Sequence, residues 1–235
     1  MSKKQKKLTH QKVNNLVTKI NPKSPISEQY RMIRTNIQFS MVDKDLKTLA
    51  CTSSMPEEGK STTISNLAVT LAQQGQKVLL VDADLRKPTI HKIMKLKNRN
   101  GLTSLLTKKS LPDKAIKQAP EVDNLYILPS GFIPPNPSEL LASKMMEELI
   151  STFSEEYDLI LFDTPPVLAV TDAQILSNRC DGVVLVIKSN QTEKKDLVKA
   201  KDLLDRTQCN VMGTILNAVD QKDANYYNYY RAENE

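Results

Sequence analysis

The chain has 235 residues, of which 40% are hydrophobic and 26% charged, and its formal net charge is +6. A chain of this length and composition can bury a core, which excludes full disorder and a fibrous repeat. Residues 1–23 contain seven lysines and no acid, so the remainder is close to neutral and the positive charge belongs to a leader. Trp is absent and aromatic residues make up only 5%, which leaves few platforms for stacking single-stranded bases. We therefore expect no nucleic-acid partner.

No apolar run approaches the roughly 18 to 20 residues that span a bilayer, and the basic leader lacks the apolar centre of a signal peptide. These features predict a cytoplasmic protein. The three cysteines, Cys51, Cys180 and Cys209, stand at wide spacings that match neither a disulfide framework nor a zinc site. We expect them to be small buried residues.

The leader, residues 1–24, is polar and rich in lysine, and is predicted to be flexible. Between residues 24 and 40, apolar side chains recur at spacings of four and three, which indicates a helix. Ser27 is its expected N-cap. A short apolar run at 46–52 then predicts the first strand.

A turn-like stretch at 53–59 leads from this strand into a helical pattern at 60–74, which Gly75 closes. Further apolar runs lie at 78–81, 125–128, 159–162, 182–187 and 211–216. Each of these runs is long enough for a strand and too short for a helix, so we predict five more strands.

Helical spacing separates most of these runs, notably at 193–206. The proline-rich stretch 129–137 predicts a loop, and Asn136 is the expected N-cap of the helix after it. Continuous apolar strands that alternate with helices are typical of a parallel sheet covered on both faces. We therefore predict an α/β fold, with a mostly parallel sheet and helices on both faces, in a single domain at 25–219. A tyrosine-rich flexible tail follows at 220–235.

Residues 54–61, Ser-Met-Pro-Glu-Glu-Gly-Lys-Ser, lie between the first predicted strand and the first long helix. A phosphate-binding loop belongs there, because backbone N–H groups and the helix N-terminus converge on an anion. Ser54 replaces the first glycine of the usual Gly-x-x-x-x-Gly-Lys-Ser pattern, but the position after a buried strand favours a P-loop NTPase-like site. In such a site Lys60 reaches the β- and γ-phosphates and the Ser61 hydroxyl binds Mg²⁺.

Three acids directly follow predicted strands: Asp82 and Asp84 come after 78–81, and Asp163 comes after 159–162. Ligands of open α/β sheets bind outside the carboxyl ends of the strands, so we expect all three acids at the edge that carries the loop. Mg²⁺ takes one or two carboxylates together with waters and phosphate oxygens. A single acid would merely begin a turn, but three beside Gly-Lys-Ser predict a site for ATP and Mg²⁺.

Residues 82–88 read Asp-Ala-Asp-Leu-Arg-Lys-Pro and follow a predicted strand. They resemble the second Walker-like motif of the bacterial tyrosine kinase family. Residues 162–166, Phe-Asp-Thr-Pro-Pro, are similar to its Walker B motif, and 130–141 resemble another family segment. The phosphate loop departs from the family's Pro-Gly-x-Gly-Lys pattern, because Glu57 stands at the first of those glycines.

Two further motifs carry the same resemblance. Glu28, Arg31 and Arg34 match the family's Glu-x-x-Arg-x-x-Arg oligomerisation motif. The C-terminal tyrosine cluster, which accepts phosphate in the family, is matched by Tyr226, Tyr227, Tyr229 and Tyr230. The resemblance extends from about residue 25 to the end of the chain.

The resemblance implies an ATP-dependent protein-tyrosine kinase that modifies its own C-terminal tyrosines, with one subunit of a ring acting on another. It implies a role in capsule or exopolysaccharide production, protein substrates and a cognate tyrosine phosphatase. It also implies a membrane-bound activator, whose cytoplasmic tail would keep the kinase at the inner face of the cell membrane. Asn217 would be a contact for adenine.

We expect the phosphates to be held by the Lys60 ammonium and by the backbone N–H groups of Glu58, Gly59, Lys60, Ser61 and Thr62. Ser61 and Asp84 would serve Mg²⁺, with Asp163 in its outer shell. Asp82 is expected to orient and deprotonate the tyrosine hydroxyl. Arg86 meets either a phosphate or a neighbouring subunit, and the sequence leaves both open.

Two other interpretations stay open. A partitioning or division-site ATPase of the ParA/MinD kind would be a dimer switch on the same fold. Those proteins carry a signature lysine where Met55 stands here, and they lack a tyrosine-rich tail. A non-catalytic adaptor would bind ATP only to assemble. The fate of the γ-phosphate separates the three: transfer to protein, hydrolysis, or retention.

Overall fold

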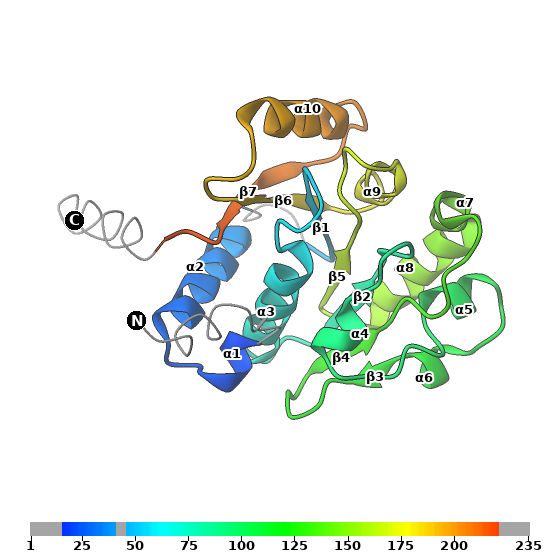
Figure 1. Cartoon of the computed structure of the whole chain (residues 1–235). Coiled ribbons are helices and arrows are strands. Elements are labelled where there is room, and N and C mark those ends of the chain that lie inside the picture. Colours follow the sequence, from blue (N-terminus) through cyan, green and yellow to red (C-terminus); the bar gives the residue numbers. More distant parts are fainter. Residues whose placement is uncertain (1–15, 41–45, 221–235) are drawn as a thin grey trace, which may run out of the picture.

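The computed structural model describes residues 16–40 and 46–220 (Figure 1). Within these residues a seven-stranded sheet has the order β3-β4-β2-β5-β1-β6-β7. The strands are β1 (Thr48–Ser53), β2 (Val78–Asp82), β3 (Lys117–Gln118), β4 (Leu125–Leu128), β5 (Leu159–Asp163), β6 (Gly182–Lys188) and β7 (Val211–Asn217). Neighbouring strands are parallel except β3 and β4, which are antiparallel. The predicted α/β fold with a mostly parallel sheet is confirmed.

The strands form at the predicted apolar runs, because a strand covered on both faces has no side for polar residues. β1, β2 and β5 are buried at every position. Successive side chains of a strand point to opposite faces, so Leu49 and Cys51 enter one core while Ala50 enters another. The sequence did not predict β3, because its two exposed residues are too few to show a pattern.

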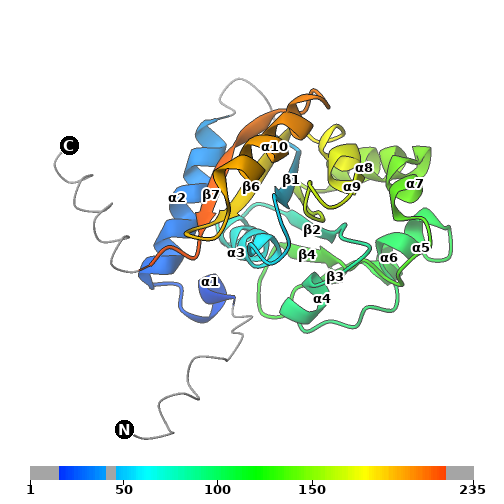
Figure 2. The same cartoon turned by 45° about the horizontal axis from the view of Figure 1, so that its top comes forward.

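Helices cover both faces of the sheet (Figure 2). They are α1 (Val17–Ile20), α2 (Pro25–Phe39), α3 (Lys60–Ala72), α4 (Ile90–Ile93), α5 (Leu102–Leu106), α6 (Pro112–Ala115), α7 (Pro137–Ala142), α8 (Lys144–Glu156), α9 (Asp172–Ser177) and α10 (Lys194–Asp205). Helices α2 to α4 share a core with one face of the sheet, and α5 to α10 share cores with the other. None of the helices in the described part of the chain is long and apolar enough to cross a membrane.

The folded part of the chain begins earlier than the predicted boundary at residue 24. α1 packs against α3, and Thr18 is buried there. The Thr18 backbone N–H and hydroxyl both donate to Oδ1 of Asn66, at 3.1 and 2.9 Å. The prediction of a flexible leader is therefore wrong for residues 16–24, where long-range hydrogen bonds hold a segment of polar composition. Residues 1–15 lie outside the described part of the chain.

Two predicted helix caps differ from the structure. Ser24, not Ser27, caps α2: its Oγ accepts the Ser27 backbone N–H at 3.1 Å. Proline at the first helical position, residue 25, fits this earlier start. Asn136 precedes α7, but its side chain donates to the Glu139 carboxylate at 2.7 Å and caps no backbone group.

The cysteines are only in part as predicted. Cys51 is buried in β1, whereas Cys180 and Cys209 are half-buried beside the core under α10. Cys180 and Cys209 each lie two residues before a strand, β6 and β7 respectively.

Candidate active site

The loop between β1 and α3 carries the phosphate motif. Glu57 has a φ of 65° and Gly59 a φ of 92°, both in the left-handed region that suits glycine. At Gly59 a second constraint applies, because an added Cβ would lie 2.0 Å from Nδ2 of Asn217. Glu57 is exposed and adopts without a glycine the conformation expected of one, at a cost of about 1–2 kcal/mol.

Glu58 braces this loop from within the fold. The residue is buried, and its carboxylate accepts the Met55 backbone N–H at 2.9 Å and the Thr192 hydroxyl at 2.5 Å. Its carbonyl accepts Nδ2 of Asn217 at 2.9 Å. Asn217, expected at the adenine, thus contacts the phosphate loop itself. No sequence pattern points to Thr192, which lies 134 residues from Glu58.

Lys60 lies between two acids at the carboxyl edge of the sheet. Its Nζ is 3.1 Å from Oδ2 of Asp84 and 3.6 Å from Oδ1 of Asp163, and its side chain is 11% exposed. Burial alone would lower the pKa of Lys60, but attraction by Asp163 and Asp84 outweighs burial and raises it. The Lys60 side chain is therefore firmly cationic, which suits contact with an anion.

Asp82 and Asp163 are register partners on the adjacent strands β2 and β5, and neither residue is exposed. Oδ2 of Asp82 accepts the backbone N–H groups of Thr89 and Ile90, both at 3.0 Å. Its Oδ1 and both oxygens of Asp163 have no hydrogen-bond partner among the residues described. Burial raises the pKa of both carboxyls, and the charge of Asp163 raises that of Asp82 further. Buried carboxylate oxygens without a hydrogen bond are typical of a functional site.

Ser61 and Thr62 lie in the first turn of α3. The Ser61 hydroxyl accepts from Lys60 Nζ at 3.3 Å and lies 3.3 Å from the Thr89 hydroxyl. The Thr62 carbonyl accepts Nδ2 of Asn66 at 2.9 Å. No side chain caps this 13-residue helix, which leaves its positive N-terminus open to an anion.

Three groups at this edge offer oxygen ligands: the Ser61 hydroxyl, the Asp84 carboxylate and the Asp163 carboxylate, whose oxygens accept no hydrogen bond from the described residues. Mg²⁺ prefers oxygen ligands. Among the residues that the structure describes, no three His, Cys, Asp or Glu side chains are arranged to hold a metal by themselves. The donors therefore fit a cation that takes its other ligands from phosphate and water, as Mg²⁺ does in nucleotide sites.

Arg86 has partners within its own chain, which the sequence did not predict. It donates to both carboxylate oxygens of Asp172, at 2.8 and 3.0 Å, and to the Ser138 hydroxyl at 3.1 Å. Neither Asp172 nor Ser138 was identified from the sequence as a functional residue. Asp172 lies outside the matched motifs, and the segment 130–141 that contains Ser138 was given no role.

The predicted oligomerisation residues lie on α2, where each contacts its own chain. Nη2 of Arg31 is 2.6 Å from Oε2 of Glu28, and its Nη1 donates to the Pro22 carbonyl. Nη1 of Arg34 donates to the Thr70 carbonyl of α3 at 3.1 Å. The predicted phosphate acceptors lie outside the described residues: Tyr226, Tyr227, Tyr229 and Tyr230.

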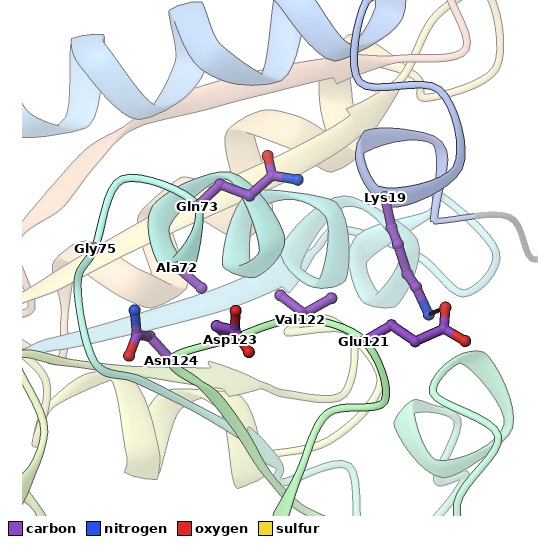
Figure 3. Close-up of a pocket in the computed structure, with 8 residues that line it drawn as sticks. All are labelled: Lys19, Ala72, Gln73, Gly75, Glu121, Val122, Asp123 and Asn124. Atoms are coloured by element: carbon purple, nitrogen blue, oxygen red, sulfur yellow. Dashed lines mark ion pairs between the residues drawn. The ribbon is translucent and has the colours of Figure 1, made fainter.

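A separate concavity of about 370 Å³ lies at the other end of α3 (Figure 3). It is lined by Lys19, Ala72, Gln73, Gly75, Glu121, Val122, Asp123 and Asn124. The 13 residues of α3 separate it from the phosphate loop by about 20 Å. None of the candidate site residues lines it, and its Lys19 ammonium is already paired with Glu121 at 2.9 Å. This concavity is therefore separate from the candidate site residues.

An open helix N-terminus after a buried strand, a buried lysine and acids at strand ends define a P-loop nucleotide-binding protein. A family model described as an AAA domain matches residues 46–211. The chain is 53% identical over 216 residues to the tyrosine-protein kinase YwqD of Bacillus subtilis (strain 168), covering 92% of this chain and 91% of the relative. It is 43% identical over 210 residues to the putative tyrosine-protein kinase CapB of Staphylococcus aureus, covering 89% and 92%. The chain belongs to the bacterial tyrosine kinase family.

Solved structures agree with this placement. The chimerical protein CapA2B2 is similar with a TM-score of 0.85 and 43% identity, covering 88% of this chain and 90% of that chain. The septum site-determining protein MinD of Pyrococcus horikoshii OT3, solved with Mg-ADP, is less similar: the TM-score is 0.62 and the identity 26%, covering 72% and 69%. The predicted family is therefore confirmed, and the division-site ATPases share its fold at a greater distance.

Proposed function

We propose that this protein transfers the γ-phosphate of ATP to tyrosine, first to the four tyrosines of its own C-terminal tail. The observation that best supports the proposal is the arrangement of Lys60, Asp84 and Asp163 at the start of α3, in a chain of this family. Phosphoryl transfer depends mainly on positioning and on neutralising the charge of the transferred group. A firmly cationic lysine at an open helix N-terminus supplies both.

In this proposal Lys60 leaves its acidic partners to contact the β- and γ-phosphates, together with the backbone N–H groups of residues 58–62. Ser61 and Asp84 would hold Mg²⁺, with Asp163 in its outer shell. When bound, Mg²⁺ neutralises negative charge on the phosphate oxygens. Two observations support this division of roles: the buried Asp163 oxygens accept no hydrogen bond from the described residues, and the Ser61 hydroxyl lies 3.3 Å from Lys60 Nζ.

Asp82 would orient the acceptor hydroxyl and take its proton. Its Oδ2 is occupied by two backbone N–H groups, which leaves Oδ1 free to accept. Burial and the neighbouring Asp163 raise the pKa of the Asp82 carboxyl, and a stronger base is better matched to a phenol. Because its Oδ2 is hydrogen-bonded, the Asp82 carboxylate has a fixed direction, and its Oδ1 can orient the acceptor hydroxyl.

The tail is long enough to deliver an acceptor. The residues from Asn217 to Tyr226 span up to about 30 Å when extended, at 3.3–3.6 Å per residue. That length allows a tyrosine of one subunit to reach the site of its neighbour, so we propose that the reaction occurs in trans.

Two variants mixed in one tube test this proposal. The first carries Lys60→Met and keeps its tyrosines; the second keeps Lys60 and has phenylalanine at all four tail tyrosines. With γ-labelled ATP, Mg²⁺ and the activator's cytoplasmic tail, we expect label on the first chain only when the second is present. Mass spectrometry then assigns the label to a residue and to a chain.

Other results would favour the rival functions. Release of inorganic phosphate without protein label would indicate a switch ATPase of the MinD kind, the more distant structural neighbour. Intact ATP bound to an assembled protein would indicate an adaptor. Label in the tyrosine-free tail variant alone would show that the acceptor assignment is wrong.

The wider setting is part of the proposal. We infer a role in capsule or exopolysaccharide production, supported by the family of the named relatives. A membrane-bound activator would hold the kinase at the inner face of the cell membrane, and a tyrosine phosphatase would reverse its action on itself and on protein substrates. The similarity to CapA2B2, a chimerical protein, is consistent with a two-component arrangement.

We also propose that Glu28, Arg31 and Arg34 join adjacent subunits in a ring. The ion pair between Glu28 and Arg31 lies on the outer part of α2 and can exchange for one between chains. Arg31→Ala with Arg34→Ala should lower the mass measured by light scattering. An unchanged mass would contradict this role.

A further inference from the structure

The segment between β2 and α4, residues 83–89, carries Asp84 and is held from its inner side by two acids. Oδ1 of Asp84 accepts the Lys87 backbone N–H at 2.9 Å. Oδ2 of Asp82 accepts the N–H groups of Thr89 and Ile90 at 3.0 Å. Each acid proposed for catalysis or Mg²⁺ on this side of the site therefore depends on the path of this short segment.

The outer side of the same segment is held by a second set of contacts. Nε and Nη2 of Arg86 donate to the two carboxylate oxygens of Asp172, the first residue of α9, at 2.8 and 3.0 Å. Nη2 also donates to Oγ of Ser138 in α7, and that hydroxyl donates to Oδ1 of Asp172 at 2.6 Å. Three elements far apart in sequence thus meet at one carboxylate.

These contacts have the chemistry of a rigid link. Asp172 is fully buried and Arg86 is its ion-pair partner, whereas the Arg86 side chain is 39% exposed. A buried carboxylate deprived of its cation is costly, so the pair is held closed. Because the two bonds run parallel from a planar fork, they fix the direction of the guanidinium as well as its distance.

We propose that Arg86, Asp172 and Ser138 form a positioning device for phosphoryl transfer, which keeps residues 83–89 in the path that places Asp84 beside Lys60 and Ser61. The inference rests on the proposed kinase function and adds residues to its site. Arg86 touches no reacting atom in this account. It acts through the segment, by coupling the end of β2 to α7 and α9.

A purely structural role is the competing explanation, and the chain offers a matched control. Arg179 donates to the carbonyls of Ala142 and Ser143 at 2.7 and 3.2 Å and pairs with Glu147 at 3.0 Å. These contacts tie the end of α9 to the α7–α8 junction rather than to the Asp84 segment. The loss of Arg179 should therefore weaken the fold and leave residues 83–89 in place.

The test compares the full chain with Arg86→Gln, Arg86→Lys, Asp172→Asn and the control Arg179→Gln. The first readout is hydrogen exchange of backbone amides in the nucleotide-free protein, which requires no activity. We expect the amides of Lys87, Thr89 and Ile90 to exchange at least about tenfold faster in Arg86→Gln and Asp172→Asn. In Arg179→Gln these three amides should keep their protection.

The second readout is the single-turnover rate of phosphate transfer at saturating Mg-ATP, beside the affinity for ADP measured without Mg²⁺. Loss of a group that supports a metal ligand from outside typically costs 10–100-fold, and Arg86 supports Asp84 indirectly through residues 83–89, so we expect a rate loss of about tenfold in Arg86→Gln. ADP affinity should change by less than about threefold, because the phosphate loop is untouched. Arg86→Lys should fall between, because one ammonium cannot make both parallel bonds.

Unchanged exchange at residues 87–90 in Arg86→Gln would overturn the inference. Equal acceleration across the whole chain, matched by Arg179→Gln, would overturn it as well and leave a structural role. A wild-type chain that never labels tyrosine would instead overturn the kinase proposal, and the exchange data would still decide whether Arg86 holds the segment.

Discussion

Acidic side chains at the two ends of the parallel strands differ in their hydrogen bonding. We call these ends the amino edge and the carboxyl edge of the sheet. At the amino edge Asp181 accepts the backbone N–H groups of Lys47 and Thr48, at 2.9 and 2.8 Å, and the Thr48 hydroxyl at 2.8 Å. At the carboxyl edge, oxygens of Asp82 and Asp163 are buried without hydrogen-bond partners among the described residues. Both edges are built from the same parallel strands.

The difference separates an acid that stabilises the fold from the acids that we propose for phosphoryl transfer. A satisfied carboxylate stabilises the backbone groups around it, whereas an unsatisfied buried one costs stability. The fold accepts that cost where Lys60 partly offsets it, and burial raises the pKa of Asp82 and Asp163. Four substitutions test this contrast.

Lys60→Met should have the largest effect. We expect no detectable tyrosine phosphorylation, because the γ-phosphate loses its cation. Without Mg²⁺ the variant should also be less stable by about 3 kcal/mol, since Asp84 and Asp163 stay buried without their partner. Denaturant titration in EDTA measures this. The control is Lys77→Met, whose ammonium lies against Tyr126 and pairs with exposed Glu156. Lys77→Met should phosphorylate tyrosine at the wild-type rate. If it were also inactive, the loss in Lys60→Met could not be assigned to the carboxyl edge of the sheet.

Asp82→Asn should separate activity from stability. The transfer rate should fall by about 10²–10⁴-fold, as expected when an orienting base is lost. The folded-state pKa of Asp82 is raised, so its contribution to stability is full below the ordinary carboxyl pKa near 4 and is lost as pH rises through the raised value. An asparagine side chain does not ionise, so the variant does not lose this stability as the pH rises. Its amide oxygen can still accept both N–H groups. In EDTA the unfolding free energy of the variant should therefore be higher than that of wild type at pH 8 and equal to it at pH 4. Lower stability at pH 8 would contradict the account.

Asp181→Ala should do the reverse at the amino edge. Three donors at the start of β1 lose their acceptor, so we expect a loss of about 2 kcal/mol in unfolding free energy. Urea titration measures it. The rate of tyrosine phosphorylation at a temperature where the variant is folded should stay within about twofold of wild type, because contacts at distant sites are usually independent. A large rate loss would show that the two edges are coupled.

Glu57→Gly should have the smallest effect. Glycine relieves the left-handed strain at φ 65° but adds entropy to the unfolded chain, so stability should change by less than about 1 kcal/mol. Removing a carboxylate from the loop should tighten ADP binding by a few fold. Lys108→Gly is the matched control, because exposed Lys108 has a φ of 55° at the end of α5. Calorimetry should show tighter ADP binding only for Glu57→Gly, and equal affinities would remove any electrostatic role for Glu57.

Most strands of this fold can be predicted from the sequence, because buried parallel strands must be apolar throughout. All six predicted strands are present, and their ends differ from the predicted bounds by two residues at most. The acids at the ends of β2 and β5 follow from the same logic, since strand ends share one edge. β3 was not predicted, because its two exposed residues are too few to show a periodic pattern.

The contacts that position the candidate site residues could not be predicted from the sequence, because each contact joins residues that are distant in the chain. Thr192 reaches Glu58, and Asp172 reaches Arg86, across 134 and 86 residues. Neither partner stands in a motif, and nothing in local spacing favours either pair. The same holds for Thr18, whose burial depends on Asn66 of α3.

Phosphorylation of the tail tyrosines through Lys60 is tested most directly by one measurement. The full chain is incubated with γ-labelled ATP, Mg²⁺ and the cytoplasmic tail of a candidate activator, and the modified residues are mapped beside Lys60→Met. We predict phosphotyrosine at one or more of residues 226, 227, 229 and 230, and none in Lys60→Met. Complete conversion of ATP to ADP and free phosphate, with every tail tyrosine unmodified, would contradict the account.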